Sequence, residues 1–168
     1  MLTGDEEKSI RGMLQTTRII VFALVAGVIS FGFVVLSTKG LPPLILNLNA
    51  GPLSLIAIVV AAMSLVMSFV VPKMLCKVIP LNQTPEVSSP KNAPLLLALQ
   101  QIQTETIIGC AILEGAAFLN LTVAMIEPNL LHLVVAAVVW LFLVARFPLF
   151  VDQFIAGVQE RLESQDLN

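Results

Sequence analysis

The order of apolar and polar positions along the chain is dominated by four long apolar runs. They cover residues 19–38, 53–71, 106–126 and 130–148. Only Glu114 interrupts the third run, and the fourth reaches residue 148 if the side chain of Arg146 extends toward the membrane surface. Each run approaches the ~20 apolar residues with which a helix crosses a bilayer. Because open structures other than helices leave backbone groups unsatisfied there, the pattern predicts an all-α fold, a four-helix bundle integral to a membrane.

The composition strengthens the prediction of a membrane protein. Hydrophobic residues make up 57% of the 168 residues, charged residues make up 12%, and the mean hydropathy is +0.95. A soluble domain carries roughly 25% charged residues, and a soluble fold of this length cannot hide so much apolar surface in one core. We therefore expect one membrane domain over residues 1–168, with the lipid bilayer as its main partner. The small net charge of -2 and the lack of a basic cluster argue against nucleic-acid binding.

Basic residues are divided unevenly between the two sides of the predicted membrane domain. Of the 9 Lys and Arg residues, only Lys39 belongs to the side that joins the first run to the second and the third to the fourth. The other side holds Lys8, Arg11, Arg18, Lys73, Lys77, Lys91, Arg146 and Arg161. Because Lys and Arg collect on the cytoplasmic side, we expect both termini and the loop of residues 72–105 to be cytoplasmic, as in a bacterial inner membrane. The tail, residues 150–168, is expected to be cytoplasmic. Its stretch 150–162 alternates apolar and charged residues at helical spacing and is expected to lie along the membrane surface.

An internal repeat relates the first run to the third. The stretches QTTRIIVFALVAG (residues 15–27) and QTETIIGCAILEG (residues 103–115) align without a gap and share Gln, Thr, two Ile, Ala and Gly. Both copies would enter the membrane from the same side, as in a parallel repeat. The repeat predicts two tandem helical hairpins, and the shared composition of apolar helices is the alternative explanation. In this alignment Ala26 stands where the second copy has Glu114.

Small residues recur at helical spacing in both copies of the repeat. Ala23 and Gly27 are one helical turn apart in the first copy, as are Ala111 and Gly115 in the second. Small residues at this spacing let helix backbones approach closely in lipid, so we expect these residues to form helix-packing contacts. A similar stripe on the second run consists of Ala57, Ala61, Ser64 and Ser68.

Glu114 is the main candidate for a functional residue because it places a carboxyl near the middle of an apolar run. The third run centres near Ala116, two residues further along the chain. A charge at this depth costs at least ~2.5 kcal/mol, so we expect the carboxyl to be protonated or paired with a donor. We expect no Lys or Arg at the same depth, and His132 lies toward the opposite end of the bundle.

The residues around Glu114 predict an ion site. Neutral donors are expected among Ser30, Ser64, Ser68, Asn120 and Thr122. We predict that Glu114 and Asn120 bind a proton or a sodium ion together. Cys110 is expected to pack beside them as a small apolar residue, in a setting that also includes Ala111 and Gly115.

The same sequence contains no pattern for a metal, a cofactor or catalysis. One His and two Cys do not match the spacing of a metal site. The remaining polar residues near the runs are Glu105, Glu127, His132 and Asp152. We expect them at different ends and on different sides of the bundle, whereas the polar residues of a membrane enzyme converge. We therefore do not expect an enzyme.

The stretch IQTETIIGCAILEGAAFLNL, residues 102–121, resembles the carboxylate-bearing helix of the proteolipid c subunit of rotary ATP synthases. In that family a helix leaves a cytoplasmic polar loop and carries an ion-binding Glu or Asp at mid-membrane, followed by small residues. The matching residues here are Glu114, Gly115 and Ala116. The resemblance implies that Glu114 binds a proton or sodium ion during translocation, in a homo-oligomer or a larger membrane complex.

Two hypotheses of different classes follow for Glu114. In the first, its carboxyl takes up and releases a proton or sodium ion, and the chain takes part in ion translocation. In the second, the chain is a non-catalytic scaffold or accessory subunit, and Glu114 is a permanently neutral group that hydrogen-bonds to a neighbouring helix. A carboxyl inside the membrane favours the first hypothesis, whereas the lack of a second ionisable residue for a relay favours the second.

Overall fold

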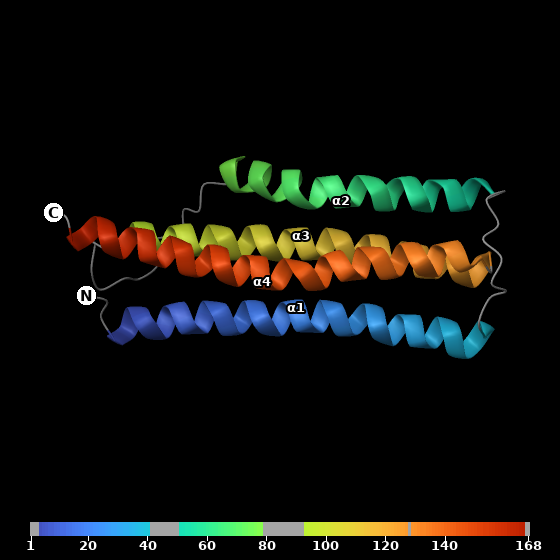
Figure 1. The fold of residues 1–168 in the computed structure, drawn as a ribbon, viewed down its shortest axis with the longest axis horizontal. Helices are drawn as coiled ribbons and strands as arrows, with labels where there is room; N and C mark the ends of the chain where they lie inside the picture. Colours follow the sequence, from blue (N-terminus) through green and yellow to red (C-terminus); the bar gives the residue numbers. More distant parts are fainter. Residues whose placement is uncertain (1–3, 41–50, 79–92, 128, 167–168) are drawn as a thin grey trace.

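The computed structural model describes residues 4–40, 51–78, 93–127 and 129–166. Within these residues the chain forms four helices, which lie side by side along one axis (Figure 1). They are α1 (Gly4–Lys39), α2 (Pro52–Val78), α3 (Ala93–Ile126) and α4 (Leu130–Asp166). The predicted all-α fold is thus confirmed. At ~1.5 Å per residue, α3 is about 50 Å long, which exceeds the ~30 Å hydrocarbon core of a bilayer.

α3 and α4 form the central pair of the bundle. α3 contacts each of the other helices, whereas the described residues of α1 and α2 do not contact each other. Figure 1 shows α1 and α2 on opposite sides of the α3–α4 pair. The structure therefore corrects the prediction of two tandem hairpins: α3 and α4 pack as a hairpin, but α1 and α2 do not. α1 and α2 bury their inner faces against α3 instead.

Three helices are long and apolar enough to cross a membrane. Their apolar parts are Lys8–Lys39, Pro52–Leu75 and Leu97–Ile126, and a shorter apolar helix, Leu130–Arg146, begins α4. In the apolar window of α3, 50% of the residues are buried, against 17% in α1 and 22% in α2. Large hydrophobic side chains of the outer helices point away from the bundle, as Phe22 does with 72% of its surface exposed. Such a continuous apolar exterior is typical of a surface that meets lipid.

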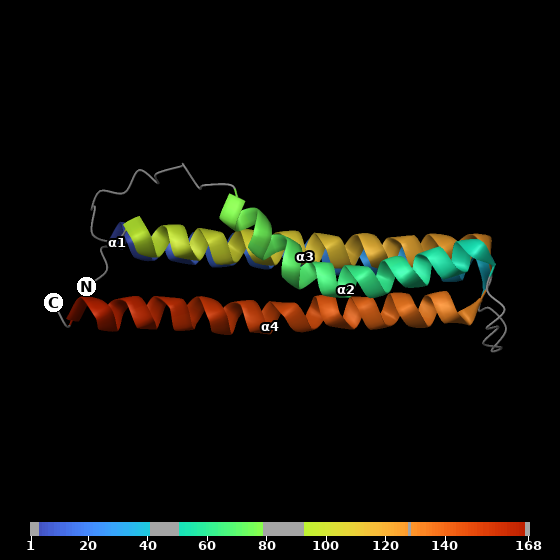
Figure 2. The same cartoon turned by 90° about the horizontal axis from the view of Figure 1, so that it is seen from above.

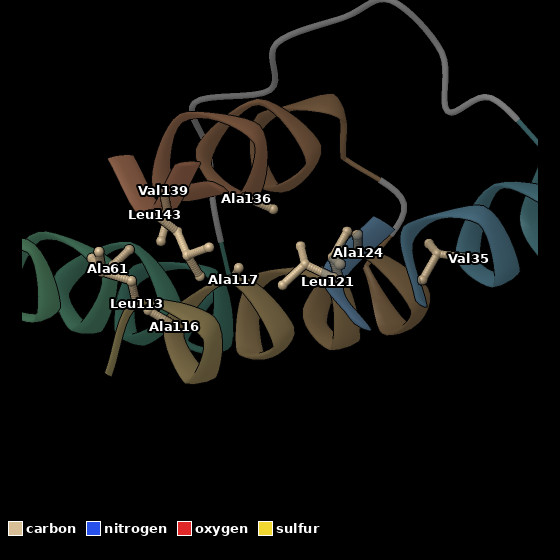
Figure 3. Close-up of a cluster of buried hydrophobic side chains, with 11 residues drawn as sticks. Val35, Ala61, Leu113, Ala116, Ala117, Leu121, Ala124, Ala136, Val139 and Leu143 are labelled. Carbon is tan, nitrogen blue, oxygen red and sulfur yellow. The ribbon is translucent and has the colours of Figure 1, made fainter. Parts of the chain in front are cut away.

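The core is built from small and branched side chains along α3. Leu113 and Ala117 of α3 lie near Val139 and Leu143 of α4 (Figure 3), and Leu121 belongs to the same buried cluster. The buried alanines are Ala57, Ala61, Ala116, Ala117, Ala124 and Ala136. Because an alanine side chain is a single methyl group, the helix backbones approach closely without a hydrophobic driving force in lipid. The predicted packing role of the alanines of α2 is confirmed.

Two aromatic contacts attach α1 to the central pair. The rings of Phe31 on α1 and Phe118 on α3 lie 5.3 Å apart between centroids, tilted by 60°. On the α4 side, Trp140 Nε1 donates a hydrogen bond of 3.4 Å to the carbonyl of Val25. A shielded indole N–H usually finds such a partner, and Trp140 is half-buried against the core.

Glycine and proline determine where α1 ends and where α2 bends. α1 is followed by Gly40, whose φ of 71° is the left-handed conformation that ends many helices. Gly40 N donates a 2.9 Å hydrogen bond to the carbonyl of Leu36. α2 bends in its C-terminal half (Figure 2), where Pro72 lies inside the helix. Proline removes one backbone hydrogen bond and pushes against the preceding turn, which accounts for the bend.

Two polar segments continue the apolar helices. Within the predicted cytoplasmic segment 72–105, α2 continues to Val78 and α3 begins at Ala93, and residues 79–92 lie outside the described part. The tail to Asp166 continues α4 as one unbroken helix instead of forming a separate surface helix (Figures 1 and 2). Its helical spacing of apolar residues extends the α4 pattern without a break.

Candidate functional site

Glu114 lies on the side of α3 that faces α1. A Cβ atom built on Gly27 would lie 3.2 Å from Glu114 Oε1 and 3.6 Å from Phe118 Cζ. Phe118 is one turn after Glu114 on the same face and contacts Phe31 of α1. The missing side chain at Gly27 therefore leaves the space that the carboxyl of Glu114 occupies.

The half-buried carboxyl of Glu114 forms no hydrogen bond and no ion pair within the described part of the chain. Two of the donors that the sequence suggested bond to their own helices. Ser68 donates to the carbonyl of Leu65 at 2.9 Å, and Thr122 donates to the carbonyl of Phe118 at 2.8 Å. Glu114 is thus a polar group at mid-helix whose hydrogen-bonding capacity is not used by its neighbours.

The small residues predicted to pack around Glu114 divide into two groups. Gly27 makes the close contact with the carboxyl. Ala23, Ala111 and Gly115 are exposed, and a Cβ built on Gly115 would meet nothing within 4 Å. Because their surfaces are exposed, these three residues do not form the predicted helix-packing contacts within the described part of this chain.

Cys110 lies one turn before Glu114 on α3. Arg146 of α4 packs at nearly the same level, against Gly109. Cys110 is a free and fully buried thiol, as its apolar surroundings predict. The half-buried side chain of Arg146 packs between α2 and α3. Its Cζ lies 4.8 Å from the ring centroid of Phe69 on α2. On the other side it packs on Gly109 so closely that a side chain there would overlap it.

The position of Arg146 changes the electrostatic setting of Glu114. Gly109 precedes Glu114 by five residues, about 7.5 Å along the helix axis. A cation is therefore nearer to the middle of α3 than the sequence indicates. Arg146 Nη1 is buried and has no hydrogen-bond partner among the described residues. A buried nitrogen without a hydrogen bond is costly, and the contact of the guanidinium with the Phe69 ring offsets part of this cost.

Asn120 points away from Glu114 and joins α3 to α2. Its Nδ2 donates to the carbonyl of Ala57 on α2 at 3.3 Å and to the carbonyl of Ala116 at 3.0 Å. Its Oδ1 faces His132 Nδ1 at 3.4 Å. Asn120 is fully buried. The structure therefore does not bring Glu114 and Asn120 together, because six residues of helix turn their side chains toward different neighbours.

His132 belongs to a polar cluster with Ser54 and Glu127 at the turn between α3 and α4. Ser54 Oγ lies 2.7 Å from His132 Nε2 and is also hydrogen-bonded to Glu127 Oε2. Ser54 and His132 are fully buried, whereas Glu127 is half-buried. The cluster joins α2, α3 and α4 by side-chain hydrogen bonds.

The ends of three helices position this cluster. α3 ends at Ile126, and Asn129 caps α4 by accepting a 3.1 Å hydrogen bond from Leu131 N. The turn between them carries Glu127 to the beginning of α2, where a Cβ on Gly51 would lie 3.0 Å from Glu127 Oε1. The positive end of the α2 dipole favours a carboxylate there. Glycine at position 51 thus lets the carboxyl approach the first turn of α2.

The sequence missed this cluster because its members are far apart along the chain. Glu127 and His132 were expected at scattered positions, yet both contact Ser54. Ser54 lies in an apolar run and was not among the candidate residues. The sequence did contain one indication of the cluster, which is that the three residues lie at the same depth in the predicted membrane domain. Ser54 begins the second apolar run, and Glu127 and His132 flank the turn between the third and fourth, so all three belong to the same end of the bundle.

The cluster is suited to holding protons. Ser54, His132 and Asn120 follow the order of a nucleophile, a base and an orienting group. Ser54 is fully buried, however, and its hydroxyl is already in contact with a carboxyl. Among the described residues there is no group of three His, Cys, Asp or Glu that could hold a metal ion. Ser54, His132 and Asn120 can donate and accept hydrogen bonds, and Ser54 and His132 can transfer protons.

Two polar sites therefore lie along α3. One consists of Glu114 against Gly27, with Arg146 of α4 packed on Gly109, five residues before Glu114. The other consists of Glu127, Ser54, His132 and Asn120. Comparison with family models, with curated proteins and with solved structures finds no match to this chain, so the geometry of these two sites carries its functional interpretation.

Proposed function

We propose that this chain is a membrane protein that binds and releases a proton at Glu114, as part of proton translocation. The observation that carries the proposal is the carboxyl of Glu114, half-buried between α1 and α3 with no hydrogen-bond partner among the described residues. A carboxyl in this setting is neutral when protonated and charged when not. Intramembrane acids of this kind mark ion pathways.

The scaffold hypothesis requires a different environment for Glu114. A permanently neutral structural acid would be held by a hydrogen bond to a neighbouring helix, because an unmet polar group in hydrocarbon is costly. Among the described residues, side-chain hydrogen bonds between helices are made by Asn120, Ser54, Trp140 and Gln103. Glu114 contributes none of them, and this favours a titrating role over a structural one.

The contacts of Glu114 favour a proton over a sodium ion. A hard metal cation requires several oxygen ligands at short distance, as calcium and magnesium sites illustrate. Gly27, against which the carboxyl lies, has no side chain that could supply an oxygen ligand. A proton needs a single carboxyl oxygen, so the geometry suits the smaller ligand.

The resemblance to the proteolipid c subunit supports the same chemistry and adds a proposal about assembly. Ala111 and Gly115 leave an exposed face of small residues on α3 beside Glu114. Small residues suit close contact with another helix. We propose a homo-oligomer in which this face meets a second copy, with both termini on the cytoplasmic side.

Carbodiimide labelling tests the proposal because the reagent attacks a protonated carboxyl in an apolar setting. We expect Glu114 to be labelled in native membranes and the labelling to fall as the pH rises. Proton flux into liposomes that contain the purified chain is expected to disappear in Glu114→Gln. Glu105→Gln, which removes a carboxyl from the polar end of α3, is the control and should leave the flux unchanged.

Two results would separate the hypotheses. An unreactive Glu114, combined with full function of the Glu114→Gln variant, contradicts proton binding. Tolerance of Glu114→Gln together with loss of assembly in Glu114→Leu supports the scaffold, because a scaffold needs the hydrogen bond and not the charge.

A further inference from the structure

The cluster at the α3–α4 turn contains two ionisable side chains that are bridged by one hydroxyl. Ser54 Oγ contacts the carboxyl of Glu127 and lies 2.7 Å from His132 Nε2. In the described part of the chain, Glu127 is the charged group that faces His132. The neighbours of this cluster determine how many hydrogens it holds and which atoms donate them.

Asn120 determines which ring nitrogen of His132 carries a hydrogen. Its Nδ2 faces two carbonyl oxygens, those of Ala57 at 3.3 Å and Ala116 at 3.0 Å. Because both partners only accept, this atom must be the amide nitrogen, and the oxygen must face His132 Nδ1 at 3.4 Å. An amide oxygen accepts as well, so Nδ1 bears a hydrogen and donates it to Asn120.

Ser54 has one hydrogen to donate and two groups that can accept it. When it donates to Glu127, His132 Nε2 must donate to Ser54, and the cluster holds a carboxylate and an imidazolium. When it donates to Nε2, Glu127 must donate to Ser54, and both groups are neutral. The two arrangements contain the same number of hydrogens and differ only in the positions of two of them.

We infer that Glu127, Ser54 and His132 form a second proton-binding site, in which one proton is shared between a carboxyl and an imidazole through a hydroxyl. In the transfer, the O–H bond of Glu127 breaks as a new O–H bond forms on Ser54. The original O–H bond of Ser54 breaks as an N–H bond forms at His132 Nε2. Ser54 ends with one hydrogen, as it began, and no other reactant is required.

The burial of the three groups determines from which side protons reach the site. Glu127 is half-buried, whereas Ser54 and His132 are fully buried. Protons therefore enter at Glu127 and reach the imidazole through Ser54. The inner end of the cluster, Asn120, is six residues from Glu114, about 9 Å along α3. The inference uses none of the contacts of Glu114 and does not depend on proton binding there.

His132 is the only histidine of the chain, so a nitrogen label on histidine reports this site alone. The full chain with ¹⁵N-histidine in lipid vesicles is measured by NMR at neutral pH. We expect Nδ1 to be protonated and Nε2 to give a signal between those of a protonated and an unprotonated ring nitrogen. Glu127→Gln, which is nearly the same size, should make Nε2 fully unprotonated, because a glutamine amide cannot supply the shared proton.

Two variants of Ser54 test whether the proton is shared through its hydroxyl or whether it is enough that Glu127 is near His132. Ser54→Ala removes the bridge and should also leave Nε2 unprotonated, whereas Ser54→Thr retains a hydroxyl and should keep the wild-type signal. Glu105→Gln serves as the control and should not change either nitrogen. A wild-type Nε2 that is entirely protonated or entirely unprotonated overturns the inference. So does a wild-type Nδ1 that is unprotonated. An Nε2 signal that Glu127→Gln leaves unchanged overturns it as well. The wild-type spectrum decides the first two without any variant.

Discussion

The carboxyl of Glu114 on α3 lies against Gly27 on α1, so that a Cβ at Gly27 would be only 3.2 Å from Glu114 Oε1. The two residues come from the two copies of the sequence repeat, in which Gly27 aligns with Gly115 and not with Glu114. The absence of a side chain in one copy thus makes room for the acid of the other. This contact places the carboxyl between two helices, half-shielded from the surroundings of the bundle.

Enlarging Gly27 is expected to expel the carboxyl from the α1–α3 interface. In Gly27→Leu the new side chain fills the space that Glu114 occupies, so we predict a several-fold faster reaction of Glu114 with a lipid-soluble carbodiimide. The overpacked interface should also lose about 1–3 kcal/mol of unfolding free energy. Gly12→Leu, on the same helix, is the matched control, because a Cβ there meets nothing within 4 Å. Equal labelling rates in the two variants would contradict the contact.

Gly109 and Arg146 should behave as a coupled pair. In Gly109→Ala the new methyl group overlaps the guanidinium, which must leave the ring of Phe69 and lose a cation–π contact of about 0.5–2 kcal/mol. We predict a loss of stability of that order in thermal unfolding in detergent. In the Arg146→Met background the same glycine substitution should cost much less, because the obstacle is gone. Additive effects of the two substitutions would show that the guanidinium does not pack on Gly109.

Asn120 is expected to be the most important polar residue for holding α2. Asn120→Ala removes the bonds to the carbonyl of Ala57 and to His132, and we predict a loss of about 1–2 kcal/mol of unfolding free energy. Thr122→Val is the control, since the exposed Thr122 bonds only to its own helix, and it should change stability by less than about 0.5 kcal/mol. A cost for Thr122→Val equal to that of Asn120→Ala would refute this role.

The uneven distribution of basic residues makes the orientation testable. Single cysteines are placed at position 8 or at position 39 of a chain whose two native cysteines are replaced. A membrane-impermeant thiol reagent added outside intact cells should label position 39 and leave position 8 unlabelled, because Lys and Arg remain on the cytoplasmic side. Inverted vesicles should give the opposite result. Labelling of position 8 in intact cells would reverse the proposed orientation.

The number, type and approximate limits of the helices were predictable from residue order alone. Apolar runs of membrane-spanning length predict helices because a backbone in lipid must satisfy its own hydrogen bonds. The same reasoning singled out Glu114, since one acid in an apolar run is conspicuous without any structure. Pairing between helices was not predictable, because lipid-facing and core-facing sides are both apolar and leave no contrast along the sequence. The hairpin prediction for α1 and α2 was wrong for this reason.

The sequence by itself determined that this chain forms four apolar helices with a carboxyl near the middle of the third. Only the tertiary structure decided what that carboxyl and the other polar groups meet. It turned Arg146 inward onto Gly109, separated Asn120 from Glu114, and joined Ser54 to Glu127 and His132. The physical reason is that side-chain hydrogen bonds depend on the rotation and depth of each helix. These are determined by packing between segments that are distant in the chain, which no local pattern records.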